Sequence, residues 1–246
     1  MRNCYLSFKV YFLLAPFVLG VADSAATPAY KGASYESISK LPDWSGTWVM
    51  SDEDFGRLFA PGGAAAIAPY QDSYAPAKGA DAHKGNASQC LPTGMPGIMG
   101  VPLGYEFLFN PGRVTILAEE GPLIRRIYTD GRGHAADPDP SYAGDSVGQW
   151  QDNVLVVDTV AISPKTQFVG GKVKTSGSTH VIERFYLSDR NHLRVDTEVD
   201  DPIALTKAWR YSWTYKRSDV HFVESYYCDD DRDSAGEPNL TPPESN

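Results

Sequence analysis

The chain has 246 residues, of which 42% are hydrophobic, and it carries a formal net charge of −9 at pH 7. This length is enough for one large β domain with a substantial core. The acidic balance makes nucleic acid and anionic membrane surfaces poor partners, because both repel a negatively charged protein.

The N-terminal segment 1–26 has the order of a secretory signal peptide. Two basic residues come first, an apolar run follows at 10–21, and small residues end at Ala26. The run is short and is interrupted by Pro16, so it does not favour a membrane span. A retained N-terminal anchor is the alternative. We expect a periplasmic or secreted protein with no membrane span after cleavage.

Two cysteines remain once segment 1–26, which contains Cys4, is removed: Cys90 and Cys228. An even count in an oxidising compartment predicts one disulfide. Closing so long a loop would stabilise the fold by about 4–5 kcal/mol in the chain-entropy model. The alternative is two free thiols, one of them a nucleophile, although no basic residue lies next to Cys90 to activate it.

The chain is expected to form one domain with an irregular N-terminal part. The stretch 60–85, rich in Ala, Gly and Pro, is the one candidate linker, but what precedes it is too short to fold alone. We therefore expect a first strand at 43–49 and an irregular arm within 27–104, a β body at 105–228, and an acidic disordered tail at 229–246. The Gly46-Thr47-Trp48 sequence in the first strand resembles the start of lipocalin-like and avidin-like barrels.

From Tyr105 onward, short β-rich runs alternate with turn residues, as in an all-β protein. No stretch sustains a helical period over three turns, so few helices are expected. Closure into a barrel would hide the strand edges. The sequence thus predicts an all-β fold, an antiparallel lipocalin-like barrel with an irregular N-terminal arm and one disulfide. The expected strands are 105–109, 113–118, 123–129, 147–151, 154–160, 179–187, 192–199, 205–215 and 220–227.

Alternation along the run 205–215 places four aromatic side chains, Trp209, Tyr211, Trp213 and Tyr215, on one face. Such a row forms either plain core or the wall of a ligand pocket, because aromatic residues are common in both.

Three ionisable residues fall on apolar faces at a spacing of two: Glu183, Glu224 and Arg126, the last in the same row as Tyr128. If those faces point inward, the charges are buried and must be paired or hydrogen-bonded. An interior that combines Arg, Glu and Tyr with aromatic rings is typical of a small-molecule site. The alternative is that these faces point outward and carry scattered surface apolar residues.

The densest polar cluster lies in the long loop 130–148, which holds His134, Asp137, Asp139 and Tyr142. Long polar loops are often functional. His134, oriented by a carboxylate, can act as a general base, and Arg126 or Tyr128 can stabilise a developing anion.

Three other interpretations of the loop remain open. A metal site is disfavoured because the loop has one histidine and no zinc-type spacing. A nucleophilic Ser146 lacks the Gly-x-Ser-x-Gly elbow. The carboxylates can also simply brace the loop against nearby arginines.

Four motifs resemble those of a large family of exported bacterial proteins, most of them of unassigned activity: CLPTGMP at 90–96, PGRVTI at 111–116, RIYTDGRGH at 126–134 and LVVDT at 155–159. The resemblance runs from about Trp44 to Cys228. At Ala143 the chain departs from the family, which usually has Asn there, so the local turn can differ. The resemblance implies an association with the breakdown of plant-derived aromatic compounds by cofactor-free lyases that act on lignin dimers.

Two functions follow as hypotheses. The first is a cofactor-free acid–base enzyme, of lyase or isomerase type, that acts on an apolar aromatic molecule such as a lignin-derived dimer, with Trp209, Tyr211, Trp213, Tyr142, Glu183 and Glu224 binding the substrate. The second is a periplasmic carrier of a small hydrophobic or aromatic molecule without turnover. The enzyme is favoured because a carrier does not need the His, Asp, Arg and Tyr residues together. No nucleotide or haem motif appears, and we expect neither an organic cofactor nor a metal.

Overall fold

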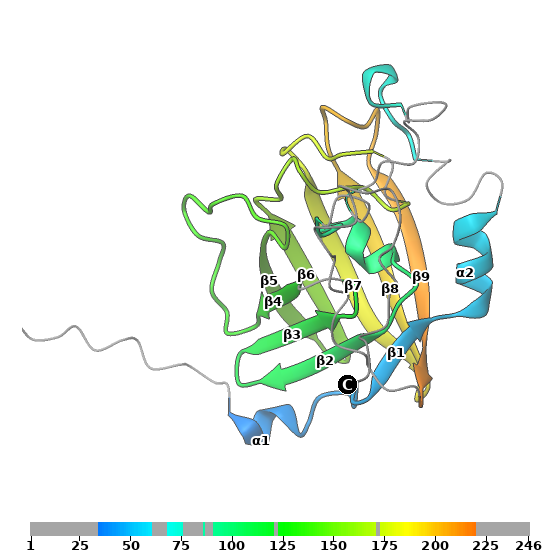
Figure 1. Ribbon diagram of the computed structural model, residues 1–246. Coiled ribbons are helices and arrows are strands. Elements are labelled where there is room, and N and C mark those ends of the chain that lie inside the picture. The colour runs from blue at the N-terminus through cyan, green and yellow to red at the C-terminus, as the bar shows by residue number, and fades with distance from the viewer. Residues whose placement is uncertain are drawn as a thin grey trace, which may run out of the picture. The chain divides into compact units, whose positions relative to one another are not determined.

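In the computed structural model, the strands of the described residues close into a barrel in which neighbours follow chain order and β9 pairs with β1 (Figure 1). The structure describes residues 34–60, 68–75, 86, 91–120, 123–170 and 173–219. The prediction of an all-β barrel is confirmed. The strands are β1 (Thr47–Met50), β2 (Tyr105–Asn110), β3 (Arg113–Ala118), β4 (Ile124–Tyr128), β5 (Asp145–Gln151), β6 (Val154–Val160), β7 (His180–Asp189), β8 (His192–Asp200) and β9 (Trp209–Ser218).

The strand boundaries differ from prediction most clearly at the last strand of the described part. β3 and β6 have the predicted bounds, whereas β9 begins at Trp209 rather than at 205. The buried Asp201 carboxylate accepts hydrogen bonds from the backbone N–H groups of Ile203 and Ala204. These bonds hold the chain in a turn just before the strand. The predicted strand 220–227 lies outside the described residues.

One pairing departs from the predicted antiparallel pattern. β4 and β5 are parallel, with Ile127 opposite Ser146 and Tyr128 opposite Val147. Parallel neighbours need a crossover of a dozen or more residues, because the chain must return to the end where the first strand began. The connection 129–144 is this crossover. The length of the polar loop therefore has a topological cause, whatever its chemical role.

Helices are short in the described part of the chain: α1 (Tyr35–Ile38), α2 (Asp52–Phe59) and the 3₁₀ helices Asp72–Tyr74 and Gly97–Gly100. Ser51 begins α2 by accepting a hydrogen bond from a backbone N–H of its first turn, which also carries three carboxylates. None of these helices is long and apolar enough to cross a membrane.

α2 covers the part of β9 that β1 does not reach. Asp54 accepts a hydrogen bond of 2.6 Å from the Thr214 backbone N–H, and Arg57 donates one of 2.6 Å to the Ser212 carbonyl. These side chains satisfy backbone groups that would otherwise form an open strand edge. The barrel is thus completed by a helix at this point.

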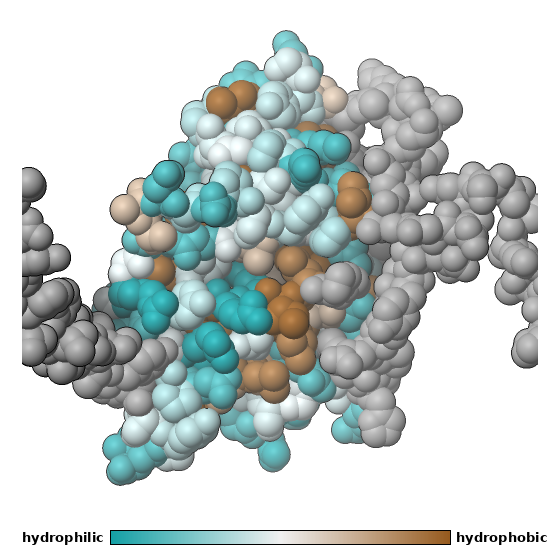
Figure 2. Space-filling view, turned by 60° about the vertical axis from the view of Figure 1, so that its left-hand side comes forward, coloured by the Kyte–Doolittle hydropathy of each residue, from teal (hydrophilic) through white to brown (hydrophobic). Residues whose placement is uncertain are grey.

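Aromatic side chains fill the barrel interior. The buried ring of Trp44 lies 5.4 Å from Phe107, 5.4 Å from Phe109 and 5.3 Å from Trp150, measured between centroids. Tilted and edge-on pairs of this kind are favourable for aromatic rings. The face in Figure 2 is mostly hydrophilic or neutral, with an apolar patch in its lower half and smaller apolar areas near the top and at the right. Most of the large aromatic residues of the strands are buried.

One end of the barrel is closed by residues 93–101, which we call the plug segment. The Tyr105 hydroxyl lies 2.5 Å from the Ile98 carbonyl, and the Tyr215 hydroxyl donates to the Met99 carbonyl. Both tyrosines are buried strand residues, so the plug segment is tied to the barrel wall from inside.

The opposite end lies where the β7–β8 hairpin turns. There Arg217 of β9 donates hydrogen bonds to the Asp43 carbonyl, at 2.9 Å, and to the Arg190 carbonyl, at 3.2 Å. This side chain joins the chain before β1 to the hairpin.

Candidate functional site

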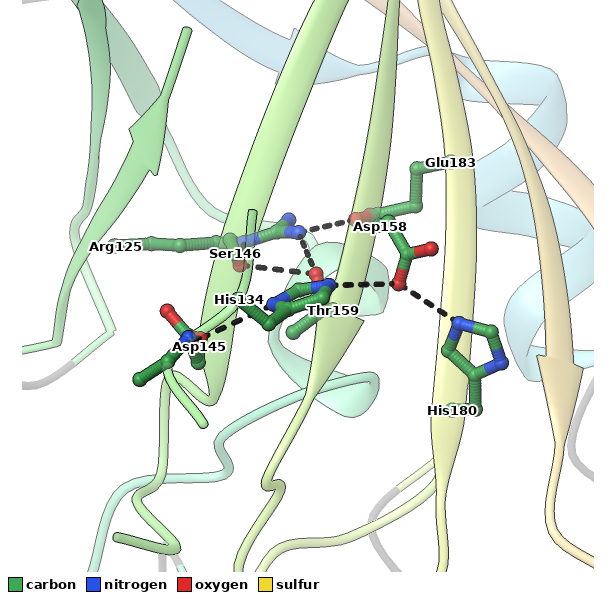
Figure 3. A network of polar contacts seen from close by, with 9 residues as sticks. Arg125, His134, Asp145, Ser146, Asp158, Thr159, His180 and Glu183 are labelled. Carbon is green, nitrogen blue, oxygen red and sulfur yellow. Dashed lines mark hydrogen bonds and ion pairs between the residues drawn. The ribbon is translucent and has the colours of Figure 1, made fainter. Parts of the chain in front are cut away.

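A buried ion pair lies inside the barrel between Arg125 of β4 and Glu183 of β7. Their side chains are 2% and 0% exposed. Arg125 donates from Nη2 to Glu183 Oε2 and, at 3.0 Å, to Thr159 Oγ1. Its Nε lies 3.4 Å from Ser146 Oγ, which is 2.9 Å from Thr159 Oγ1 (Figure 3). Residues from β4, β5, β6 and β7 therefore meet in one polar network within an aromatic core.

The network leaves several buried polar atoms without a hydrogen-bond partner among the described residues. They are Arg125 Nη1, Glu183 Oε1 and the indole nitrogens of Trp209 and Trp213. The Tyr211 hydroxyl, by contrast, interacts with the hydroxyl of Thr197. Thr197 lies opposite both Glu183 and Tyr211 in the sheet, so these three polar side chains occupy adjacent positions. Leaving such groups unpaired in a core costs free energy, and each one calls for an explanation.

Tyr211 stands at the centre of this cluster. Its ring lies 4.5 Å from the ring of Trp209 and 5.7 Å from that of Trp213. Burial raises the pKa of Tyr211 well above its ordinary value, and the Glu183 carboxylate adds to the shift. The phenol therefore stays protonated at ordinary pH and can both donate and accept a hydrogen bond.

The predicted position of one arginine was wrong by a single residue. Arg126 is exposed and Arg125 is buried, because β4 turns Arg125 and Ile127 inward and Ile124 outward. Tyr128 shares the outer face with Arg126, and the Arg132 guanidinium lies 4.1 Å from the centroid of its ring. The interior cation is thus Arg125. In the sequence, Arg125 has apolar neighbours at a spacing of two, Leu123 and Ile127, just as Arg126 has Ile124 and Tyr128, so both arginines show the same pattern.

Other predicted site residues lie where alternation placed them. Glu183 is fully buried, and the row of Trp209, Tyr211 and Trp213 faces inward, with Trp209 and Trp213 buried and Tyr211 half-buried. Tyr142 contributes its backbone carbonyl, which accepts a hydrogen bond of 2.8 Å from the Met95 N–H of the plug segment. Glu224 and the predicted disulfide partners Cys90 and Cys228 lie outside the described residues, and their roles stay predictions.

His134 lies in a second polar cluster, on the outer face of the barrel. Its Nδ1 is 3.1 Å from Asp145 Oδ2 and its Nε2 is 3.2 Å from Asp158 Oδ1, which in turn lies 2.8 Å from His180 Nε2 (Figure 3). Asp158 points outward because its neighbour Thr159 points inward. Strand alternation therefore puts this cluster and the Arg125 network on opposite sides of the same strands.

The predicted partners of His134, Asp137 and Asp139, are exposed and take no part in the contacts around its ring. A neutral imidazole has one N–H, so only the protonated ring can donate to Asp145 and Asp158 at once. In either state the contacts attach the crossover loop to β5 and β6.

A groove of about 650 Å³ adjoins this outer cluster. Asp158 lines the groove together with Arg132, whose guanidinium is also paired with Asp130. In the described part of the chain, no group of three or more His, Cys, Asp or Glu side chains is arranged to hold a metal ion. The remaining lining residues are Thr129, Gly131, Val147, Gly148, Gln149, Trp150, Val156 and Ile182.

The chain thus offers two candidate sites, the interior cluster around Arg125 and Glu183 and the outer cluster around His134. The side chains of the interior cluster are more deeply buried than those of the outer cluster, and the interior cluster contains the polar atoms without a hydrogen-bond partner. Searches for similarity find no protein-family model and no curated protein that matches this chain.

Proposed function

We propose that this chain is an exported, cofactor-free acid–base enzyme of lyase or isomerase type that acts on an apolar aromatic molecule inside a lipocalin-like barrel. The observation that carries the proposal is the buried Arg125–Glu183 pair, in which each partner keeps one polar atom unpaired among the described residues. The signal-like segment 1–26 supports export, and the closed barrel with its Gly46-Thr47-Trp48 strand supports the lipocalin-like comparison.

The pair is better explained by function than by stability. Taking two charges out of water costs several kcal/mol per ion, and replacing a buried ion pair by apolar residues is often neutral or stabilising. A protein that keeps such a pair beside unpaired indole groups retains a polar site in its core at the expense of stability. Enzyme and binding sites are where this arrangement is common.

The roles follow from the chemistry of each group. Glu183 has a free oxygen, Oε1, which can take a proton from the substrate and return it to the product. Arg125 stays charged, and its free Nη1 can donate to an oxygen that gains negative charge. The protonated Tyr211 hydroxyl is a second donor for the same purpose. Trp209 and Trp213 supply flat apolar walls for an aromatic ring.

A carrier without turnover is the second candidate, and one observation favours it. The plug segment covers one end of the barrel and is tied to the wall by Tyr105 and Tyr215, so a molecule bound inside would be shielded from water at that end. A carrier needs this enclosure, whereas an enzyme needs the plug segment to move in each cycle.

The test is to incubate the purified mature protein with a panel of oxygenated aromatic dimers and to detect products by mass spectrometry. Glu183→Gln keeps the side-chain volume, and we expect it to bind substrate but to lose turnover by about 10²–10⁴-fold. Binding without product by the wild-type protein would leave the carrier. Loss of turnover in His134→Ala but not in Glu183→Gln would move the chemistry to the outer groove.

A further inference from the structure

We infer that the interior site takes an electroneutral arene that presents acceptor oxygens, such as carbonyl or ether groups, rather than an aromatic carboxylate. This inference rests on the proposed function, because it names the ligand class of the same site. Two observations on the described residues support it: the number of unpaired hydrogen-bond donors and acceptors in the cluster, and the balance of buried charges.

The first observation concerns hydrogen-bonding groups. Arg125 Nη1 and the indole nitrogens of Trp209 and Trp213 are unpaired and can only donate. Glu183 Oε1 is the one unpaired atom of the cluster that, when ionised, can only accept. The hydroxyls of Thr197 and Tyr211 interact with each other and leave this balance unchanged. The cluster is therefore rich in donors, and a ligand that satisfies it must offer mainly acceptors.

The second observation concerns charge. Arg125 is the only cationic side chain among the buried residues that the structure describes, and Glu183 already neutralises it. An anionic ligand would lie beside Glu183. Arg57, whose guanidinium lies 5.2 Å from the centroid of the Trp213 ring, is half-exposed and already paired with Asp54, so the added charge would lack a free cation, and an unpaired charge in a core is expensive.

The two observations together select the ligand class. A hydrocarbon would leave the indole and guanidinium donors unpaired, and a carboxylate would satisfy them but leave a net negative charge in the core. A neutral arene with carbonyl or ether oxygens satisfies donors without adding charge. The row in which Tyr211 lies between Trp209 and Trp213 offers aromatic surfaces on which the ligand's ring would pack.

Three probes of similar shape test this inference by isothermal titration calorimetry with the mature protein. Methyl 3,4-dimethoxybenzoate is neutral with acceptor oxygens, 3,4-dimethoxybenzoate is the matching anion, and 4-ethyl-1,2-dimethylbenzene lacks oxygen. We expect the ester to bind at least tenfold more tightly than either of the others. The inference would be overturned if the carboxylate bound as tightly as the ester or more tightly, or if the hydrocarbon bound as tightly as the ester. Neither result would contradict the proposed function.

Two matched double variants test whether the ester binds at the interior cluster. Arg125→Met with Glu183→Met should abolish the preference for the ester. Arg210→Met with Glu198→Met removes an exposed ion pair from β9 and β8 and should preserve it. If the first variant does not fold, Trp209→Phe with Trp213→Phe removes two donors, keeps the rings, and should weaken the ester several-fold more than the hydrocarbon. No binding of any probe, or ester binding that both interior variants retain, would overturn the proposed function itself.

Discussion

The Arg217 guanidinium lies over the indole ring of Trp48, with its central carbon 4.5 Å from the ring centroid. Trp48 is fully buried in β1, and Arg217 comes from β9, its neighbour across the closure of the barrel. The same guanidinium donates to the carbonyls of Asp43, Ser45 and Arg190. One side chain therefore joins the first strand, the last strand and a hairpin.

Arg217→Lys should lower the free energy of unfolding by about 1–3 kcal/mol. Lysine keeps the charge, but it loses the planar fork that reaches several carbonyls while stacking on an indole. Urea unfolding followed by tryptophan fluorescence measures the change. Arg210→Lys, at an exposed pair, is the control and should shift stability by less than about 0.5 kcal/mol.

The Arg125–Glu183 pair should behave non-additively. Arg125→Met alone should cost about 3–5 kcal/mol, because it leaves Glu183 buried and uncompensated. Adding Glu183→Met should recover most of that loss, which a double-mutant cycle from urea unfolding will show. Additive losses from the two single variants would mean that the pair is not coupled in solution.

Gly97→Ala should destabilise the plug segment by about 1–3 kcal/mol through overpacking. A Cβ at Gly97 would lie 2.5 Å from the Gln167 carbonyl oxygen and 2.7 Å from Thr93 Cγ2. Gly133→Ala is the matched control, since a Cβ there meets nothing within 4 Å. Thermal unfolding compares the two, and equal melting temperatures would show that the plug segment packs loosely.

Glu120→Gln should stabilise the protein increasingly as pH rises. Burial raises the pKa of the Glu120 carboxyl above 4.5, although the hydrogen bond from Thr93 opposes the shift. Between pH 4.5 and the raised pKa of Glu120, the folded wild type therefore binds more protons than the unfolded chain. Its free energy of unfolding falls as pH rises through that range. Urea unfolding at a series of pH values should show the difference between variant and wild type growing there. A difference independent of pH would contradict the raised pKa.

His134→Ala should release the crossover loop 129–144 while leaving turnover close to that of the wild type. The change removes the contacts to Asp145 and Asp158, and it should cost about 1 kcal/mol. Hydrogen exchange should rise in the loop and not in the barrel strands. His192→Ala, which breaks an exposed contact to Asp189, is the control and should leave exchange in the loop unchanged.

The failure at Arg126 shows what strand alternation can and cannot decide. In β9 the aromatic residues Trp209, Tyr211 and Trp213 alternate with Arg210 and Ser212, and only one face is apolar. In β4 both arginines have apolar residues at a spacing of two, so either face satisfies the pattern. The choice depends on pairing with β3 and β5, where a shift of one residue exchanges the faces.

Local order along the chain determined the strands, the turns and the inward row of β9, because side chains in a strand alternate whatever the strand pairs with. Tertiary structure alone decided the partners of His134, since Asp145 and Asp158 reach it only after the β5–β6 hairpin brings them together. It also decided that β4 and β5 run parallel, which turned a candidate functional loop into a crossover. Contacts between distant segments depend on register and closure, and no local pattern in the sequence encodes them.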